Sequence, residues 1–300
     1  MARGALTIIG AGVAALVAAL TLLPLGAVFF RAGGWPSPGA GDGSAIVFTL
    51  SQALISALLS CILAVPVARA LARRDFPGRG ALIPDKGAPF ILPRIAVGPG
   101  LLAAFGGSGL ENYLLAMAGL PPLSIYGFGG VVLAHVFLNL PLAVRMLLHG
   151  WQAIPAERFR LAEALGLGPR GQARHLEWPM LREVLPGAFV VIFVLCLTSF
   201  AVALTLGGGP RATTVELAIY QAVKFDFDLG RAGLLAAVQF ALCLVAALGG
   251  WPWVAPAGMG AGLGRRVPVP AVGGWRRGAD ALAIGGAALF LLTPLLMVVV

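Results

Sequence analysis

Charged residues are scarce in this sequence. Only 11% of its 300 residues are Asp, Glu, Lys or Arg, whereas 59% are hydrophobic, and the mean hydropathy is +0.93. A soluble globular domain carries about 25% charged residues, and no soluble core absorbs this much apolar side chain. The shortage of charge therefore excludes a soluble enzyme, a disordered tail and a disulfide-stapled secreted module. The composition predicts an integral membrane protein.

Cysteine is also scarce, and the positions of the cysteines exclude two common roles. Cys61, Cys196 and Cys243 lie inside apolar runs, without a CxxC or Cys/His spacing around them. We interpret them as small buried hydrophobic residues and expect neither disulfides nor metal ligands.

Motifs for catalysis and for ion coupling are missing. The glycine clusters lack the Gly-Lys-Ser/Thr continuation that cradles phosphates, and the chain has neither HExxH nor GxSxG. We therefore expect that the chain is not an enzyme, holds no cofactor or metal, and takes its energy from another chain. Asp and Glu fall almost entirely in loops. This disfavours an ion-coupled carrier, because such carriers often place acidic residues in mid-membrane.

Seven apolar runs are candidates for membrane-spanning helices, since a hydrocarbon core of ~30 Å needs about 20 apolar residues. They are residues 5–29, 44–71, 88–105, 129–148, 184–206, 231–250 and 281–300. The first run is longer than the apolar region of a signal peptide, ~7–15 residues, so we expect an uncleaved helix. Residues 110–123 are short and broken by glycine and proline, which predicts a re-entrant or interfacial segment.

The basic residues alternate from loop to loop. The loops after the second, fourth and sixth runs are rich in arginine, and the loops between them hold few basic residues. Because cytoplasmic loops of membrane proteins carry an excess of Lys and Arg, this alternation predicts a cytoplasmic N-terminus. The net charge of +9 is then a signal of membrane orientation, and we expect no binding of nucleic acid.

The most informative loop is 150–186, on the predicted cytoplasmic side. Pro155 and Glu157 are typical of the first turn of a helix, and Gly166 is typical of its end. A second short amphipathic helix is expected next, closed by Pro179. Two short helices joined by a glycine elbow form a knob that suits docking into a groove of a partner protein.

This loop resembles the coupling loop of ABC-importer permeases, in which Glu-Ala-Ala is followed by Gly and later by Leu-Pro. Gly166 and Pro179 match the family spacing, whereas Arg160 replaces the family Glu and Trp178 replaces the Leu. Glu163, one turn further on, offers a carboxylate instead. The resemblance implies an ATPase-coupling site made of Arg160, Ala162, Glu163, Ala164, Gly166, Glu177 and Pro179.

The resemblance extends over about residues 44–248, and the stretches 126–141 and 206–220 are most similar to the permeases of thiamine importers. It implies an all-α polytopic transmembrane helical bundle of the ABC-importer permease type in a bacterial inner membrane. The implied cargo is thiamine or its phosphates; the same machinery importing ferric iron, sulfate or a polyamine is the alternative. The implied partners are an ABC ATPase subunit, a periplasmic substrate-binding protein and a second permease half, fused or separate, within the lipid bilayer.

These patterns predict four parts in the chain. They are an N-terminal transmembrane helix with an external loop (1–43), a permease core (44–250), a cytoplasmic linker (251–278) and the start of a further transmembrane helix (279–300). The last apolar run has no polar anchor after it, although membrane helices normally finish with one. We therefore expect that the sequence is cut and that a second repeat follows.

The sequence leaves two roles open. His135 and Asn139 lie one turn apart on one face of the fourth run, where they either line the translocation path or form hydrogen bonds between helices. Residues 212–228, on the predicted outer side, combine acidic and aromatic residues. They either contact a binding protein or cap the bundle.

Overall fold

A computed structural model describes residues 2–31, 37–74, 94–107, 109–122, 124–207, 209, 212–253 and 274–299. Within these ranges the regular structure is entirely helical, which confirms the predicted all-α class. The helices are α1 Ala2–Arg31, α2 Asp42–Arg73, α4 Arg94–Phe105, α5 Leu110–Met117, α6 Phe128–Ala153, α7 Ala156–Ala164, α8 Pro169–Gln172, α9 Trp178–Leu197, α10 Phe200–Leu206, α11 Val215–Lys224, α12 Leu229–Gly250 and α13 Trp275–Val299. A π-helical turn, Ala173–Glu177, joins α8 to α9, and a 3-10 turn, Trp251–Trp253, follows α12.

In the part of the chain that the structure describes, five helical segments are long and apolar enough to cross a membrane. They are Asp42–Arg73, Phe128–Ala153, Pro169–Leu197, Leu229–Trp253 and Arg277–Met297, and they correspond to five of the seven predicted runs. The first predicted run forms α1, a helix of 30 residues. Residues 88–93 of the third run lie outside the described ranges, and α4 covers 94–105.

The predicted closure of the second coupling-loop helix at Pro179 is wrong. The helical segment Pro169–Leu197 runs without interruption from the loop into the membrane, with Pro179 in the first turn of α9. Proline has no N–H to donate to the carbonyl four residues earlier, and its ring clashes with that carbonyl. The N–H of Trp178 instead donates to the carbonyl of Ala173, five residues back. The proline is thus accommodated by one π-helical turn.

The fifth predicted run, 184–206, is not one continuous helix. α9 ends at Leu197, and α10 begins at Phe200. Only two polar residues interrupt the apolar run at this point, so average hydropathy does not reveal the break. Thr198 and Ser199 stand at the break, and hydroxyl side chains compete with the backbone for hydrogen bonds.

α13 begins earlier than the last apolar run. Trp275 opens it, within the stretch 251–278 that we predict as a linker, whose residues 254–273 lie outside the described ranges. The polar start of this helix is anchored by an ion pair between Asp280 and Arg74, the residue directly after α2. Hydropathy detects only the apolar part of such a helix, whereas its hydrogen-bonded backbone continues into the polar flank.

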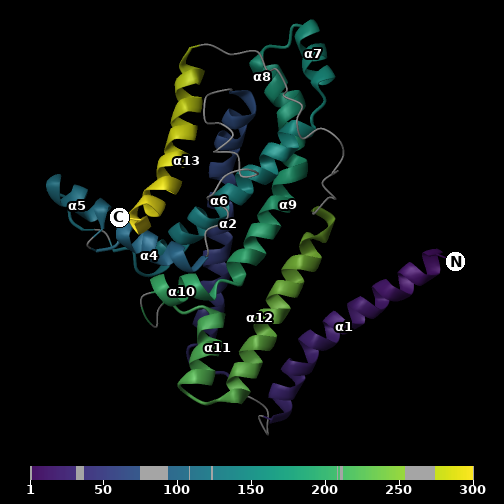
Figure 1. Ribbon diagram of the computed structural model, residues 1–300, viewed down its shortest axis with the longest axis vertical. Helices are drawn as coiled ribbons and strands as arrows, with labels where there is room; N and C mark the ends of the chain where they lie inside the picture. The colour runs from purple at the N-terminus through teal and green to yellow at the C-terminus, as the bar shows by residue number, and fades with distance from the viewer. Residues whose placement is uncertain are drawn as a thin grey trace.

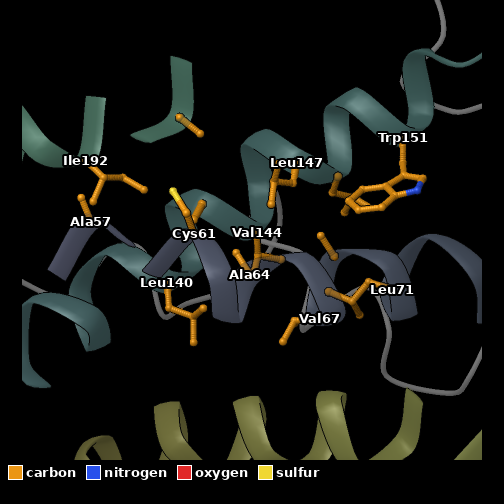
Figure 2. Packing of buried hydrophobic residues seen from close by; sticks show 14 of the residues in the cluster. Ala57, Cys61, Ala64, Val67, Leu71, Leu140, Val144, Leu147, Trp151 and Ile192 are labelled. Atoms are coloured by element: carbon orange, nitrogen blue, oxygen red, sulfur yellow. The ribbon is translucent and has the colours of Figure 1, made fainter. Parts of the chain in front are cut away.

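The core is built around α2, which packs against α6 and α9 (Figure 2). The face that α2 buries is made largely of small residues, among them Ala53, Ala57, Cys61, Ala64 and Ala68. Small side chains let helix backbones approach closely, which is how helices associate inside a membrane. Larger side chains from α6 and α9, among them Leu140, Leu147, Trp151 and Ile192, belong to the same buried cluster (Figure 2).

The bundle has two distinct ends (Figure 1). α7 and α8 lie at one end, and α11 lies at the opposite end (Figure 1). α13 packs against α4 and α2, whereas α1 lies at the periphery beside α12 (Figure 1). The predicted coupling loop and the arginine-rich end of α2 therefore meet at the same end of the molecule.

Candidate functional site

The predicted glycine elbow is present after α7. The N–H of Gly166 donates to the carbonyl of Glu163, and the N–H of Leu167 donates to the carbonyl of Ala162, both at 2.9 Å. This pair of bonds is the Schellman arrangement that ends many helices. Gly166 has φ of +69°, a left-handed conformation that costs a residue with a side chain ~1–2 kcal/mol. The elbow thus requires glycine for its backbone.

The surface of α7 combines polar and apolar side chains. Phe159 and Ala162 are buried and hold α7 to the rest of the protein. Arg160, Glu163, Ala164 and Gly166, all predicted coupling residues, are exposed.

Two exposed leucines on this knob belong to the same surface, and sequence reasoning missed them. Leu161 is 60% exposed and Leu165 is 68% exposed. Residues four apart are neighbours on a helix surface, so the pair forms an apolar strip beside the charged residues of α7. The sequence signal for this strip is two leucines four residues apart, Leu161 within α7 and Leu165 directly after it.

Glu177 and Pro179 differ sharply in their surroundings. Pro179 is exposed, whereas Glu177 is only 4% exposed. The Oε2 atom of Glu177 lies 2.8 Å from Nη2 of Arg69, and its Oε1 atom accepts a hydrogen bond from Nη2 of Arg73. The structure therefore separates Glu177 from the exposed coupling residues and joins it to α2.

A second ion pair lies beside this cluster and was not predicted. Nε of Arg74, which follows the last residue of α2, is 2.7 Å from Oδ2 of Asp280 in α13. The two residues are separated by 206 positions in the sequence, so no local pattern brings them together. Arg69 and Arg73 of α2 thus contact the coupling loop, and Arg74, directly after α2, contacts α13.

His135 and Asn139 lie on α6 and contact the region of the break that separates α9 from α10. Nε2 of His135 is 2.6 Å from Oγ of Ser199. The Asn139 amide donates to the carbonyl of His135 at 2.9 Å and to Sγ of Cys196 at 3.3 Å. Both residues are buried and join neighbouring helices. Among the described residues, no three His, Cys, Asp or Glu side chains gather in a way that would hold a metal ion.

The break itself is held by two glutamines that sequence reasoning missed. Nε2 of Gln52, on α2, donates to the carbonyl of Cys196 at 2.9 Å. Nε2 of Gln239, on α12, donates to the carbonyl of Leu197 at 2.8 Å. Carbonyls at the end of a helix lack partners within that helix, and such groups are costly to leave unsatisfied in an apolar medium. The two amides satisfy consecutive carbonyls at this end of α9.

At the opposite end of the bundle, Arg231 joins three segments. Its Nη2 atom is 2.7 Å from Oδ1 of Asp42, and its Nη1 atom is 3.0 Å from Oδ2 of Asp226. The predicted outer segment 212–228 forms α11, which packs on α12 and α2. Burial raises the pKa of the Glu216 carboxyl in this helix. α11 itself is thus part of the bundle, whereas Phe225 and Phe227 after it are 66% and 81% exposed.

Comparison with known proteins identifies the architecture. The chain superposes on a bacterial alginate ABC transporter, solved in complex with an alginate pentasaccharide-bound periplasmic protein, with a TM-score of 0.64 and 12% identity. The match covers 83% of this chain and 93% of that one. No family model matches the sequence.

The sequence relatives decide the family. The thiamine transport system permease protein ThiP of Brucella abortus (strain 2308) is 47% identical over 200 residues, 66% of this chain and 37% of ThiP. ThiP of Salmonella typhimurium (strain LT2) is 42% identical over 264 residues, 84% of this chain and 47% of ThiP. The molybdenum transport system permease protein ModB of Azotobacter vinelandii is 31% identical over 185 residues, 61% of this chain and 81% of ModB.

This chain belongs to the ABC-transporter permease family. The predicted resemblance is thereby confirmed, with thiamine permeases as similar relatives. The family and the five apolar helices make it a multi-pass inner-membrane protein. Permeases of this family are membrane subunits of transporters and not enzymes themselves. The chain spans less than half the length of the two ThiP proteins, 37% and 47%.

Proposed function

We propose that this chain forms one half of the membrane passage of an ATP-driven importer for thiamine or its phosphates. The observation that carries this proposal is the 42–47% identity to two thiamine transport permeases. Since the chain spans less than half of either relative, a second permease half, fused or separate, completes the passage. ATP is hydrolysed on a separate ATPase subunit.

The ATPase subunit docks on the knob formed by α7 and the Gly166 elbow. Leu161 and Leu165 supply an exposed apolar strip, and Arg160 and Glu163 supply charges beside it. A short helix with an apolar strip and a charged border is suited to a groove on a partner protein. The exposed residues of the predicted coupling site therefore contact the ATPase subunit. Glu177 is buried and does not take part in this contact.

The knob faces the cytoplasm, and α11 faces outward. The arginines at the end of α2 lie at the same end of the bundle as α7, and cytoplasmic segments are the ones rich in Arg. The alternation of basic loops supports a cytoplasmic N-terminus. A periplasmic substrate-binding protein delivers the cargo at the outer end, beside the exposed Phe225 and Phe227.

Uptake of labelled thiamine tests the cargo. The complete gene is expressed with its ATPase and binding-protein partners in bacteria that lack other thiamine uptake routes and cannot synthesise thiamine. We expect growth on low external thiamine and accumulation of the label. Cells that express the permease without the ATPase subunit are the control and should accumulate none. Uptake of ferric iron, sulfate, a polyamine or molybdate in place of thiamine would contradict the proposed cargo and leave the importer mechanism standing.

A further inference from the structure

Glu177 is a buried carboxylate in the middle of the proposed cytoplasmic machinery. It is 4% exposed and ends the π-helical turn Ala173–Glu177. Each of its two oxygens contacts a different guanidinium, from Arg69 and Arg73. These arginines are four residues apart and so lie on one face of α2. The carboxylate is thus gripped from one side by a single helix.

A buried ion pair of this kind does more for geometry than for stability. Removing charges from water is expensive, so an apolar contact of similar size would often hold two helices together as well. A charged pair differs because its hydrogen bonds are directional, so the carboxylate oxygens must stay aligned with the guanidinium N–H groups. Breaking it by removing one partner leaves an uncompensated buried charge. Glu177 therefore fixes the position of the coupling loop relative to α2.

The loop is also joined rigidly to the membrane. Pro169–Leu197 is one helical segment of 29 residues, and Glu177 lies within it. A displacement of the elbow at Gly166 moves the start of this segment. Glu177 is the point at which the segment is tied to α2, close to the proposed docking surface.

The same end of α2 continues the connection to another helix. Arg74 follows Arg73 directly, and its Nε atom is 2.7 Å from Oδ2 of Asp280 in α13. α13 in turn packs along α2 and α4. Neighbouring arginines at the end of α2 thus form ion pairs with the coupling loop on one side and with α13 on the other.

We propose that Glu177 is a positioning residue for coupling: it transmits the movement of the docked loop to α2 and, through the Arg74–Asp280 pair, to α13. This inference rests on the proposed function of the loop as the ATPase dock. Glu177 itself touches neither ATP nor cargo. Its replacement should separate ATP hydrolysis from transport without detaching the ATPase.

The test uses the complete transporter, reconstituted in proteoliposomes with its ATPase and thiamine-loaded binding protein. Glu177→Gln keeps the size of the side chain and removes its charge. We expect the ATPase subunit to copurify and basal hydrolysis to persist. Stimulation of hydrolysis by loaded binding protein and thiamine uptake should both fall by about tenfold, within the ~5–150-fold range of coupling between sites. Glu183→Gln, which removes an exposed carboxylate from the same helical segment outside the proposed docking surface, is the matched control and should retain stimulation.

Charge reversal distinguishes positioning from a general loss of folding. Glu177→Arg alone places three cations together and should be inactive. Combined with Arg73→Glu, it restores one anion between two cations, and we expect partial recovery of stimulated hydrolysis and uptake. Wild-type coupling in Glu177→Gln, or equal loss in the single and double reversal variants, would overturn the inference. A wild-type complex that neither stimulates hydrolysis nor imports thiamine would instead contradict the proposed function.

Discussion

Two helix ends, the exposed elbow at Gly166 and the buried break after Leu197, satisfy their backbone carbonyls in different ways. At the Gly166 elbow, α7 ends in an exposed turn whose carbonyls are satisfied by the backbone of the next residues. At the break after Leu197, the carbonyls are instead satisfied by amides from Gln52 and Gln239 on other helices. One interruption is local, and the other is held by tertiary contacts.

The difference follows from the solvent at each site. A helix end that faces water leaves its remaining polar groups hydrated, so a glycine turn is enough to close it. A helix end inside a bilayer has no water, so irregular backbone there persists only where protein groups satisfy it. We therefore expect changes at the elbow to affect docking and changes at the break to affect folding.

The largest expected effect tests the elbow side of this comparison. Ala164, just before the elbow, is exposed, so Ala164→Arg places a bulky charge on the proposed docking surface without disturbing the core. We expect thiamine uptake to be lost while the protein remains in the membrane with an unchanged melting temperature. Ala279→Arg, at an exposed position near the start of α13, is the control and should transport normally. Full uptake by Ala164→Arg would show that the knob is not the dock.

The two interruptions also differ in how far the sequence predicts them. The elbow follows from local residues, because glycine is favoured where a helix turns into the left-handed region. The break depends on Gln52, 144 residues away from its acceptor, and on Gln239, 42 residues away. Hydropathy measures how favourably side chains transfer from water into the bilayer, so it finds five of the spanning segments. It does not measure hydrogen bonding of the backbone, so it misses the break.

Glu177 shows the same limit within the site. Its place in the loop follows from the sequence motif, but its burial depends on Arg69 and Arg73, which lie about a hundred residues earlier in the chain and approach only when helices pack. The placement of Arg160 and Glu163, two other residues of the predicted site, on an exposed helix follows from local sequence, because it depends on one short helix. Long-range ion pairs leave no such local pattern.

The next effect concerns the stability of the break. Gln52→Leu and Gln239→Leu each remove the donor for one buried carbonyl, and an unsatisfied buried acceptor costs about 1–3 kcal/mol. We expect each variant to lower the unfolding temperature of the detergent-solubilised protein, with the double variant lower still. Gln152→Leu, at a half-buried position near the end of α6, is the control. Unchanged unfolding of the double variant would mean that the amides are not needed to hold the break.

The smallest effect separates the shape of the elbow from its surface. A Cβ atom at Gly166 would meet no atom within 4 Å, so substitution there is penalised by its φ of +69° and not by a clash. Gly166→Ala should therefore cost about 1–2 kcal/mol of local stability and weaken binding of the ATPase subunit about tenfold, since ~1.4 kcal/mol is a factor of ten in binding.

Asn tolerates the left-handed region better than Ala, and β-branched Val tolerates it least. ATPase binding should thus decrease in the order Gly, Asn, Ala, Val, although the Asn side chain is larger than that of Ala. An order that follows side-chain size instead would assign the role of Gly166 to contact with the partner and not to the turn.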